Sequence, residues 1–414
     1  MTNATRGLNG SKALMSTKTR SIVLIVLCQV ASMTLWFSAS AAIPRLLSVG
    51  QISGQQASLL TGAVQLGFVA GTLVSAFTGL ADRLDPRRIF CACAGTGAIF
   101  NVCLLASGYG SGWTIVLRFL TGMCMAGVYP VGMKLAAAWS VQRLGLMIGT
   151  LVGALTLGSA LPSLFTALLP LDWRLTVIAS SLCALIAASL INLVTLGPQH
   201  GVATRFSPSD ALRLLRRRSI RLANLGYLGH MWELYAMWAW IGPFLAWAWL
   251  QSGAPAQPRV TGLLAFVVIA SGAVGSVFAG LAADRLGRTA ITISAMIVSG
   301  LCAATIGLAA SAGMAVVCAI ALVWGVTVIA DSGQFSAAIA EMSDPKLIGT
   351  MLTIQTSLGF LLTFVAIQLM PVAVSALGWR YAFAMLAIGP ALGALAMWRL
   401  RFEPDSLRMA NGRR

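Results

Sequence analysis

Two acidic side chains lie well inside long apolar stretches, where an ionised carboxylate costs about 3 kcal/mol or more. They are Glu233, within GHMWELYAMWAW (229–240), and Asp331. His230 precedes Glu233 by three residues, a spacing that places both on one face of a helix. Carboxyl and imidazole groups in such surroundings can take up and release protons. We therefore expect Glu233, Asp331 and His230 to carry a proton, although a structural role for His230 is equally open.

Arg118 is the basic counterpart of these groups, because it also falls within an apolar stretch. A guanidinium binds carboxylates and phosphates through paired hydrogen bonds. Arg118 is predicted to hold an anionic group, or else to reach the nearby surface with its long side chain.

Polar and aromatic side chains recur at helical spacing on the first, fourth, seventh, tenth and eleventh apolar stretches. Such stripes usually serve packing, but several together can also line a pocket for a small molecule. The predicted pocket residues, besides Arg118, are Gln29, Trp36, Tyr129, Tyr227, Tyr235, Trp238, Gln334 and Gln355.

The composition indicates which elements must position these groups. The chain has 414 residues, of which 58% are hydrophobic and 9% charged, whereas a soluble protein has roughly 25% charged residues. This excludes a water-soluble globular protein and favours a polytopic membrane protein in a lipid bilayer. Two histidines, and eight cysteines without a CxxC pair, argue against a metal site. We expect no cofactor. Because the basic residues are spread between apolar runs, we expect no nucleic-acid partner either.

Twelve stretches have about 20 apolar residues, the length of a membrane-spanning helix. Most of the 28 Lys and Arg residues fall on one side if the N-terminus is cytoplasmic, so both termini are predicted inside. Reading the first stretch as a cleaved signal peptide would leave eleven. The predicted parts are an N-terminal tail (1–20), a first six-helix bundle (21–197), a basic linker (198–221), a second bundle (222–402) and a C-terminal tail (403–414).

An internal repeat of about 200 residues divides the chain. GLADRLDPRRIF (79–90) follows the second stretch, and GLAADRLGRTA (280–290) follows the eighth. The tripeptide IGT opens both the fifth and the eleventh stretch, and Trp-Arg precedes both the sixth and the twelfth. The repeat predicts two pseudo-symmetric halves.

The two repeated loops resemble the major facilitator superfamily motif between the second and third helices of each half. RFLTGMCMAG (118–127) is similar to that family's fourth-helix motif. The resemblance implies an all-α fold of two six-helix bundles that rock around a central site. It also implies that the loops form a cytoplasmic latch. The expected latch residues are Asp82, Arg83, Asp284, Arg285, Arg288 and Glu341, with Glu341 as a partner of Arg285 or Arg288.

The leading hypothesis is therefore a proton-coupled secondary transporter for a small organic or other anion, and not an enzyme. Proton-coupled efflux of an amphipathic or cationic compound is the alternative. An intramembrane enzyme is disfavoured because HExxH, GxSxG and paired GxGD motifs are missing. A transporter-like sensor stays open. The short loops favour a bacterial cytoplasmic membrane, and we expect a monomer.

Overall fold

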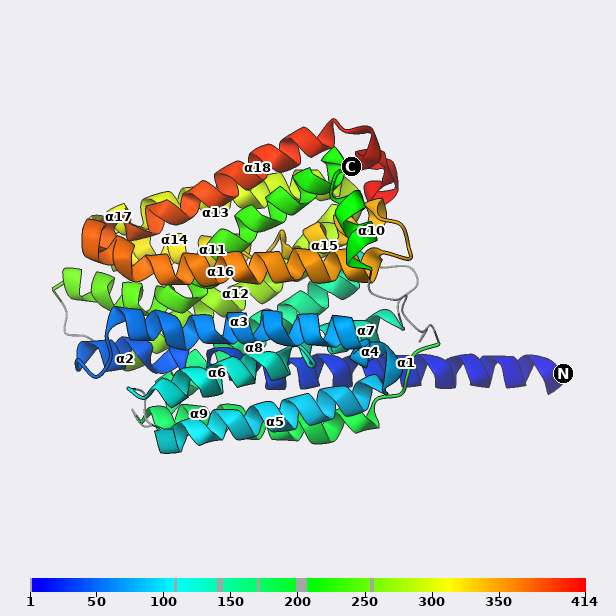
Figure 1. Cartoon of the computed structure of the whole chain (residues 1–414), viewed down its shortest axis with the longest axis horizontal. Helices are drawn as coiled ribbons and strands as arrows, with labels where there is room; N and C mark the ends of the chain where they lie inside the picture. The colour runs from blue at the N-terminus through cyan, green and yellow to red at the C-terminus, as the bar shows by residue number, and fades with distance from the viewer. Residues whose placement is uncertain (1, 108–109, 140–143, 170–171, 199–206, 254–256) are drawn as a thin grey trace.

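The computed structural model describes residues 2–107, 110–139, 144–169, 172–198, 207–253 and 257–414. The described part is helical (Figure 1). The first half of the chain contains α1 (Thr2–Phe37), α2 (Ile43–Ser48), α3 (Gly54–Thr78), α4 (Leu80–Arg83), α5 (Pro86–Ser107), α6 (Gly112–Met125), α7 (Tyr129–Ala137), α8 (Leu144–Leu168) and α9 (Trp173–Leu190). The second half contains α10 (Pro208–Leu214), α11 (Arg218–Gln251), α12 (Pro258–Leu286), α13 (Arg288–Ala309), α14 (Met314–Thr327), α15 (Ser332–Met342), α16 (Ile348–Leu377), α17 (Trp379–Ala382) and α18 (Ile388–Arg401). Short 3₁₀ turns η1 to η5 complete it, among them η1 (Ser40–Ala42) and η5 (Pro404–Gly412).

Eleven helical segments of the described chain are long and apolar enough to cross a membrane. They match eleven of the twelve predicted stretches, with ends shifted by a few residues. The remaining stretch is α11, which has 34 residues but does not reach the same apolarity, since its centre carries His230, Glu233 and several aromatic rings. The long helix that carries His230 and Glu233 thus falls short of the apolarity that marks the other eleven segments.

Two of the spans are broken in the middle. In the fourth, α6 ends at Met125 and α7 begins at Tyr129, next to Pro130, and proline suits the first turn of a helix because it has no N–H to leave unpaired. In the tenth, α14 ends at Thr327 and α15 begins after Asp331. By contrast, α11 continues through Pro243. A proline inside a long helix is tolerated where neighbouring helices hold the segment in place.

Local signals explain where several helices begin and end. Ser53 and Gln56 form a reciprocal capping box at the start of α3, and Ser111 caps α6. Gly79 ends α3 with φ +64°, a left-handed conformation that glycine adopts without strain. These ends turn the chain back on itself between successive spans.

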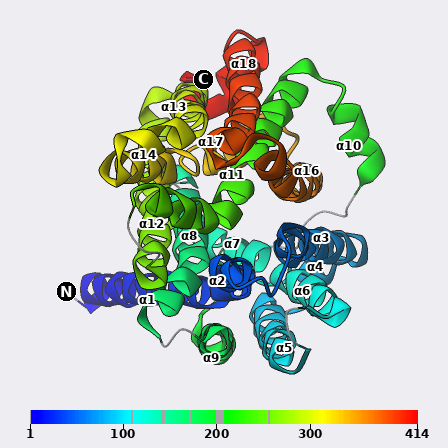
Figure 2. The ribbon, with the colours of Figure 1, turned by 90° about the vertical axis from the view of Figure 1, so that its left-hand side faces the viewer.

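The two halves of the chain meet mainly where α8 packs on α12 and where α3 packs on α16 (Figures 1 and 2). Glycines allow the first contact to be close. A Cβ atom at Gly149 would lie 2.6 Å from the Ser276 carbonyl oxygen, and one at Gly280 would lie 2.5 Å from the Gly145 carbonyl oxygen. Larger side chains at these positions would separate the helices.

Candidate functional site

Six buried aromatic rings join the two halves of the chain. Trp36 lies 5.9 Å from Tyr235 between ring centroids, and Phe68 lies 4.6 Å from Phe360. Trp36 is held in place because its indole N–H donates to Gln65 Oε1 at 3.1 Å. We call the set the aromatic cluster; it consists of Trp36, Phe37 and Phe68 from the first half and Tyr235, Trp238 and Phe360 from the second.

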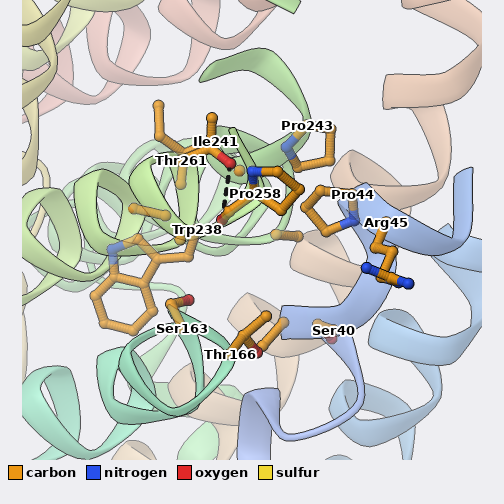
Figure 3. Close-up of a pocket in the computed structure, with 15 residues that line it drawn as sticks. Ser40, Pro44, Arg45, Ser163, Thr166, Trp238, Ile241, Pro243, Pro258 and Thr261 are labelled. Atoms are coloured by element: carbon orange, nitrogen blue, oxygen red, sulfur yellow. Dashed lines mark hydrogen bonds between the residues drawn. The ribbon is translucent and has the colours of Figure 1, made fainter. Parts of the chain in front are cut away.

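A small pocket of about 50 Å³ lies on one side of this cluster (Figure 3). Trp238 belongs to both features. The other walls come from η1 and α2, from α8, and from α12, so both halves of the chain contribute. Ser40, Ser163, Thr166 and Thr261 give it a partly polar lining. The pocket therefore lies at the junction of the halves, near the end of the molecule where α1 ends.

Polar side chains from both halves gather along the same interface nearer the middle of the spans. Gln29 of α1 lies against Gly132 of α7, one turn from Tyr129. Tyr227 of α11 lies against Gly359 of α16, which follows Gln355 by one helical turn. Tyr235 lies 5.1 Å from Phe360, the residue that follows Gly359, between ring centroids. We call Gln29, Tyr129, Tyr227, Tyr235 and Gln355 the polar ring.

The two glutamines of the polar ring differ from most buried polar groups. Both amides are buried, and neither the nitrogen nor the oxygen of either one has a hydrogen-bond partner among the described residues. A buried polar atom without a partner costs about 1–3 kcal/mol. Such groups are retained where they serve a bound molecule or ordered water. Gln29 and Gln355 are thus two predicted pocket residues whose amides have unused hydrogen-bonding capacity.

Glu233 lies inside the second half and not in the polar ring. One carboxylate oxygen accepts from Trp324 Nε1 at 2.7 Å, and the other accepts from Ser299 Oγ at 2.9 Å. Its neighbours are therefore α13 and α14. Both donors are neutral groups. In addition, none of the ion pairs among the described residues includes this carboxylate.

His230 and Asp331 form a separate buried pair. His230 Nδ1 lies 2.8 Å from Asp331 Oδ1, and both side chains are at most 3% exposed. Asp331 sits at the break between α14 and α15, two residues before Gly333, which lies against Ile148 of α8. His230 and Glu233 share one helix, as predicted, but their side chains have different partners.

Arg118 is completely buried and bound to the protein's own acceptors. Its guanidinium donates to the carbonyl oxygens of Leu35 (2.9 Å) and Trp36 and to Ser38 Oγ (3.1 Å). It also approaches Asn101, which Ser38 contacts in turn. The side chain therefore secures the end of α1 just before η1. Its predicted role in holding an anion stays a prediction, and in this arrangement a ligand would compete with carbonyl groups.

The second predicted latch loop forms a charge network. Arg288 is buried and contacts Glu341 (2.8 Å), Asp284 (3.0 Å) and Gln334 (2.8 Å). Of the two expected partners, Glu341 thus contacts Arg288, whereas Arg285 is exposed. Gln334, expected in the pocket, belongs to this network. Asp284 also touches Gly145 at the start of α8, so the network reaches the first half.

The first copy of the loop is simpler. Arg83 is exposed, and the side chain of Asp82 lies outside the described part of the chain. The described residues of the first copy hold a different ion pair, between Asp85 and Arg87.

Sequence reasoning did not find several of these contacts. Phe37, Phe68 and Phe360 complete the aromatic cluster, and Ser299 and Trp324 hold Glu233. The signal for the rings was weak, because a phenylalanine in an apolar span is typical of lipid contact or packing. The second and eleventh spans, which hold Phe68 and Phe360, contain no charged residue that could have drawn attention to them.

Comparison with known proteins now identifies the family. The family model for the Major Facilitator Superfamily matches residues 25–251, which is more than half of the chain. The chain belongs to the Major Facilitator Superfamily. A second family model, described as sugar (and other) transporter, matches residues 234–413. As a superfamily member with eleven strongly apolar helical segments, the protein is an integral membrane protein.

Among curated relatives, a gallate transporter of Pseudomonas putida is 30% identical over 142 residues, which cover 30% of this chain and 31% of the relative. The match therefore spans less than a third of that relative's length. Solved structures of the superfamily match far more of the chain. A proton:xylose symporter, XylE, aligns with TM-score 0.71 at 13% identity and covers 92% of this chain and 96% of its own.

Two further structures share the fold. The nucleoside transporter NupG gives TM-score 0.70 at 12% identity, with 92% of this chain and 100% of its own covered. The human organic anion transporter MFSD10 gives TM-score 0.67 at 16% identity, with 92% and 99% covered. At these identities the likeness concerns the fold alone.

Proposed function

We propose that the protein is a proton-coupled secondary transporter for a small aromatic carboxylate, with gallate as the first compound to test. The polar ring carries this proposal. It combines two partnerless amides and three tyrosine hydroxyls with the aromatic faces of the cluster beside it. A hydroxylated benzoate offers matching chemistry, since its ring can stack on aromatic side chains while its oxygens bond amides and hydroxyls.

The gallate transporter of Pseudomonas putida, although aligned over a short segment, supports the same substrate class. Binding of such a substrate does not require Arg118. The carboxylate would be held by neutral donors, namely the amide groups of Gln29 and Gln355 and a tyrosine hydroxyl. Neutral donors suit a transporter, because a bound anion must also leave.

The proposed proton carriers are Glu233 and the His230–Asp331 pair. Each is buried. The serine that donates to Glu233 suits either protonation state, because a hydroxyl can also accept, and His230 Nδ1 lies within 2.8 Å of Asp331 Oδ1. An anion moving with one or more protons would cross without carrying a large net charge through hydrocarbon.

The finer topology is part of the proposal. We take α11 as the seventh of twelve spans, because it lies between α12, α16 and α18 (Figure 2). The two halves, residues 21–197 and 222–402, would rock about the polar ring, with the aromatic cluster as the gate beside the pocket. The termini would face the cytoplasm of a bacterium, and the protein would act as a monomer.

Uptake into proteoliposomes tests the function directly. Radiolabelled gallate is offered with and without an imposed pH gradient, in parallel with xylose and a lipophilic quaternary cation. We expect gallate to accumulate above its external concentration only with the gradient. Accumulation of xylose or the cation in place of gallate would overturn the substrate class, and gallate flux that ignores the gradient would overturn the coupling.

Variants locate the site. Gln29→Ala and Gln355→Ala should each raise the KM for gallate about tenfold, the effect of losing roughly 1.4 kcal/mol of hydrogen bonding. Gln51→Ala is the matched control, because Gln51 is exposed at the end of the molecule. An unchanged KM in both ring variants would place the substrate elsewhere.

A further inference from the structure

An apolar groove of about 470 Å³ runs along the membrane-facing side of the second half, between α11, α16 and α18. Figure 2 shows these three helices next to one another. Two parallel stripes of side chains form its walls. On α11 they are Leu225, Leu228 and Trp232, and on α18 they are Ile388, Leu392 and Leu395. Leu225 is 53% exposed and Leu392 is 62% exposed, so the groove opens to the surroundings of the bundle.

The floor of the groove is shaped by glycines and is fixed. A Cβ atom at Gly229 would lie 2.4 Å from the Gly389 carbonyl oxygen, so α11 and α18 approach as closely as backbones can. Gly393 lies against the same turn of α11. The indole of Trp232 donates to the Met385 carbonyl oxygen at 3.2 Å, which orients the ring at one end. The groove is therefore a feature of the packed backbone.

Each stripe ends in an arginine at the same end of the groove. Arg221 precedes Leu225 by four residues on α11, and Arg399 follows Leu395 by four residues on α18, so each continues its stripe by one helical turn. Arg399 lines the groove itself. Because α11 and α18 are antiparallel neighbours, with Gly226 against Met397, both cations lie near the level of Leu222.

The nearby acids do not neutralise these two arginines. Glu403 pairs with Arg218 at 3.1 Å, and Asp405 accepts from Ser219 Oγ at 2.6 Å. In the described part of the chain, neither Arg221 nor Arg399 has a side-chain partner, and both are exposed. Two unpaired cations thus stand at one end of an apolar groove.

We propose that this groove binds an anionic phospholipid, with its phosphate between Arg221 and Arg399 and an acyl chain along the leucine stripes. Guanidinium groups bind phosphate oxygens through paired hydrogen bonds, and basic pockets at the ends of membrane helices attract anionic headgroups. A free phosphate would use the arginines but not the groove, whereas a zwitterionic lipid would fill the groove without net attraction to two cations.

Lipid binding to delipidated protein in detergent tests the proposal. Dioleoyl-phosphatidylglycerol and dioleoyl-phosphatidylcholine are titrated, and bound lipid is counted by native mass spectrometry, with thermal unfolding as a second measure. We expect phosphatidylglycerol to bind and to raise the unfolding temperature, and phosphatidylcholine to do so about tenfold more weakly or less. Equal binding of both lipids would overturn the role of the arginines.

Matched variants distinguish binding of the lipid headgroup from binding of the acyl chain. Arg221→Gln with Arg399→Gln should abolish the preference for phosphatidylglycerol. The control is Arg213→Gln with Arg408→Gln, which removes two exposed basic residues outside the groove. Leu392→Trp, which fills the groove and keeps both arginines, should weaken phosphatidylglycerol binding as well. If it does not, or if inorganic phosphate displaces the lipid completely, the groove is not a lipid site. Gallate transport is measured in parallel on the same variants, so that failure of the lipid site can be distinguished from failure of the proposed transport function.

Discussion

The buried ionisable side chains owe their surroundings to helices far away in the sequence. Glu233 is held by Ser299 and Trp324, while His230, only three residues earlier, faces Asp331. Helical spacing correctly indicated that both residues are buried in one helix. Helical spacing did not indicate the partners of these residues, because it predicts which face of a helix is buried but not which neighbouring helix packs on that face. The same limit applies to Arg118, whose partners are the carbonyl groups at the end of α1.

The geometry around Glu233 makes the substitution Glu233→Gln informative. The glutamine oxygen can still accept from Trp324, and its amide can donate to Ser299 Oγ, since a hydroxyl also accepts. The variant should therefore fold normally. We expect gradient-driven accumulation of gallate to fall to the external concentration, while exchange between internal and external gallate continues.

Ser299→Ala is the control for Glu233→Gln, because it removes one hydrogen bond and leaves the carboxyl group able to exchange a proton. It should retain accumulation. If Glu233→Gln accumulates gallate as the wild type does, Glu233 is not the carrier, and the same assay on Asp331→Asn then decides whether the His230–Asp331 pair is.

Helix ends show how elements are fixed by short-range chemistry. Asp85 caps α5, since its Oδ1 accepts from the Arg87 backbone N–H at 2.9 Å, and its carboxylate also pairs with the Arg87 side chain at 2.7 Å. Arg87 in turn donates to the Val194 carbonyl oxygen at 3.0 Å, which ties α5 to the segment that follows α9. Asp followed by Pro is a local arrangement that suits a helix start. The tie to residue 194 could not be predicted, because it depends on how α5 and α9 pack.

Replacing Asp85 should destabilise the protein in a pH-dependent way. Loss of the cap in Asp85→Ala is expected to cost about 1 kcal/mol at pH 7. The hydrogen bonds from Arg87 lower the pKa of Asp85 below its ordinary value of 3.8. The folded state therefore binds the proton less tightly than the unfolded chain, so the contribution is present above pH 3.8 and is lost as the pH falls below it.

Thermal unfolding of both proteins in detergent, from pH 7 down to pH 3, measures this effect. The difference between wild type and Asp85→Ala should be constant above pH 5 and shrink at the acid end. Arg87→Gln, which removes the cause of the lowered pKa, should show a weaker pH dependence. A difference that grows on acidification would contradict the assignment.

At the scale of the whole molecule, the lengths of the apolar runs and the internal repeat predicted the order of the spans. Bilayer thickness explains this success, since each crossing needs about 20 apolar residues. The breaks at Val128 and Asp331 were not predicted, because each span satisfies that requirement whether or not it is continuous. How the halves meet was not predictable either. Glycines such as Gly149 and Gly280 allow a close approach, but a glycine does not specify which helix approaches it.

The contact between α8 and α12 is the place to test whether the halves separate during transport. A side chain at Gly280 would collide with the Gly145 backbone, and such overpacking costs about 1–3 kcal/mol. The collision is relieved when α12 and α8 move apart, and both helices can stay folded as they do so. We therefore expect Gly280→Leu to favour the conformation in which the halves are separated at the end of the molecule that carries the repeated loops. Gallate uptake should fall about tenfold, the effect of a shift of roughly 1.4 kcal/mol in a two-state equilibrium, while gallate binding persists.

Spin labels at Leu84 and Leu286, one in each half and both exposed near the repeated loops, measure the opening by pulsed electron resonance after the native cysteines are replaced by serine. The distances in Gly280→Leu should be longer than in the parent. Gly95→Leu is the matched control, because Gly95 also lies in a helix but has open space around its Cβ position, and it should change neither the distances nor the uptake. If Gly280→Leu gives the parent's distances and yet transports slowly, its defect is local packing and the proposed separation of α8 from α12 is wrong.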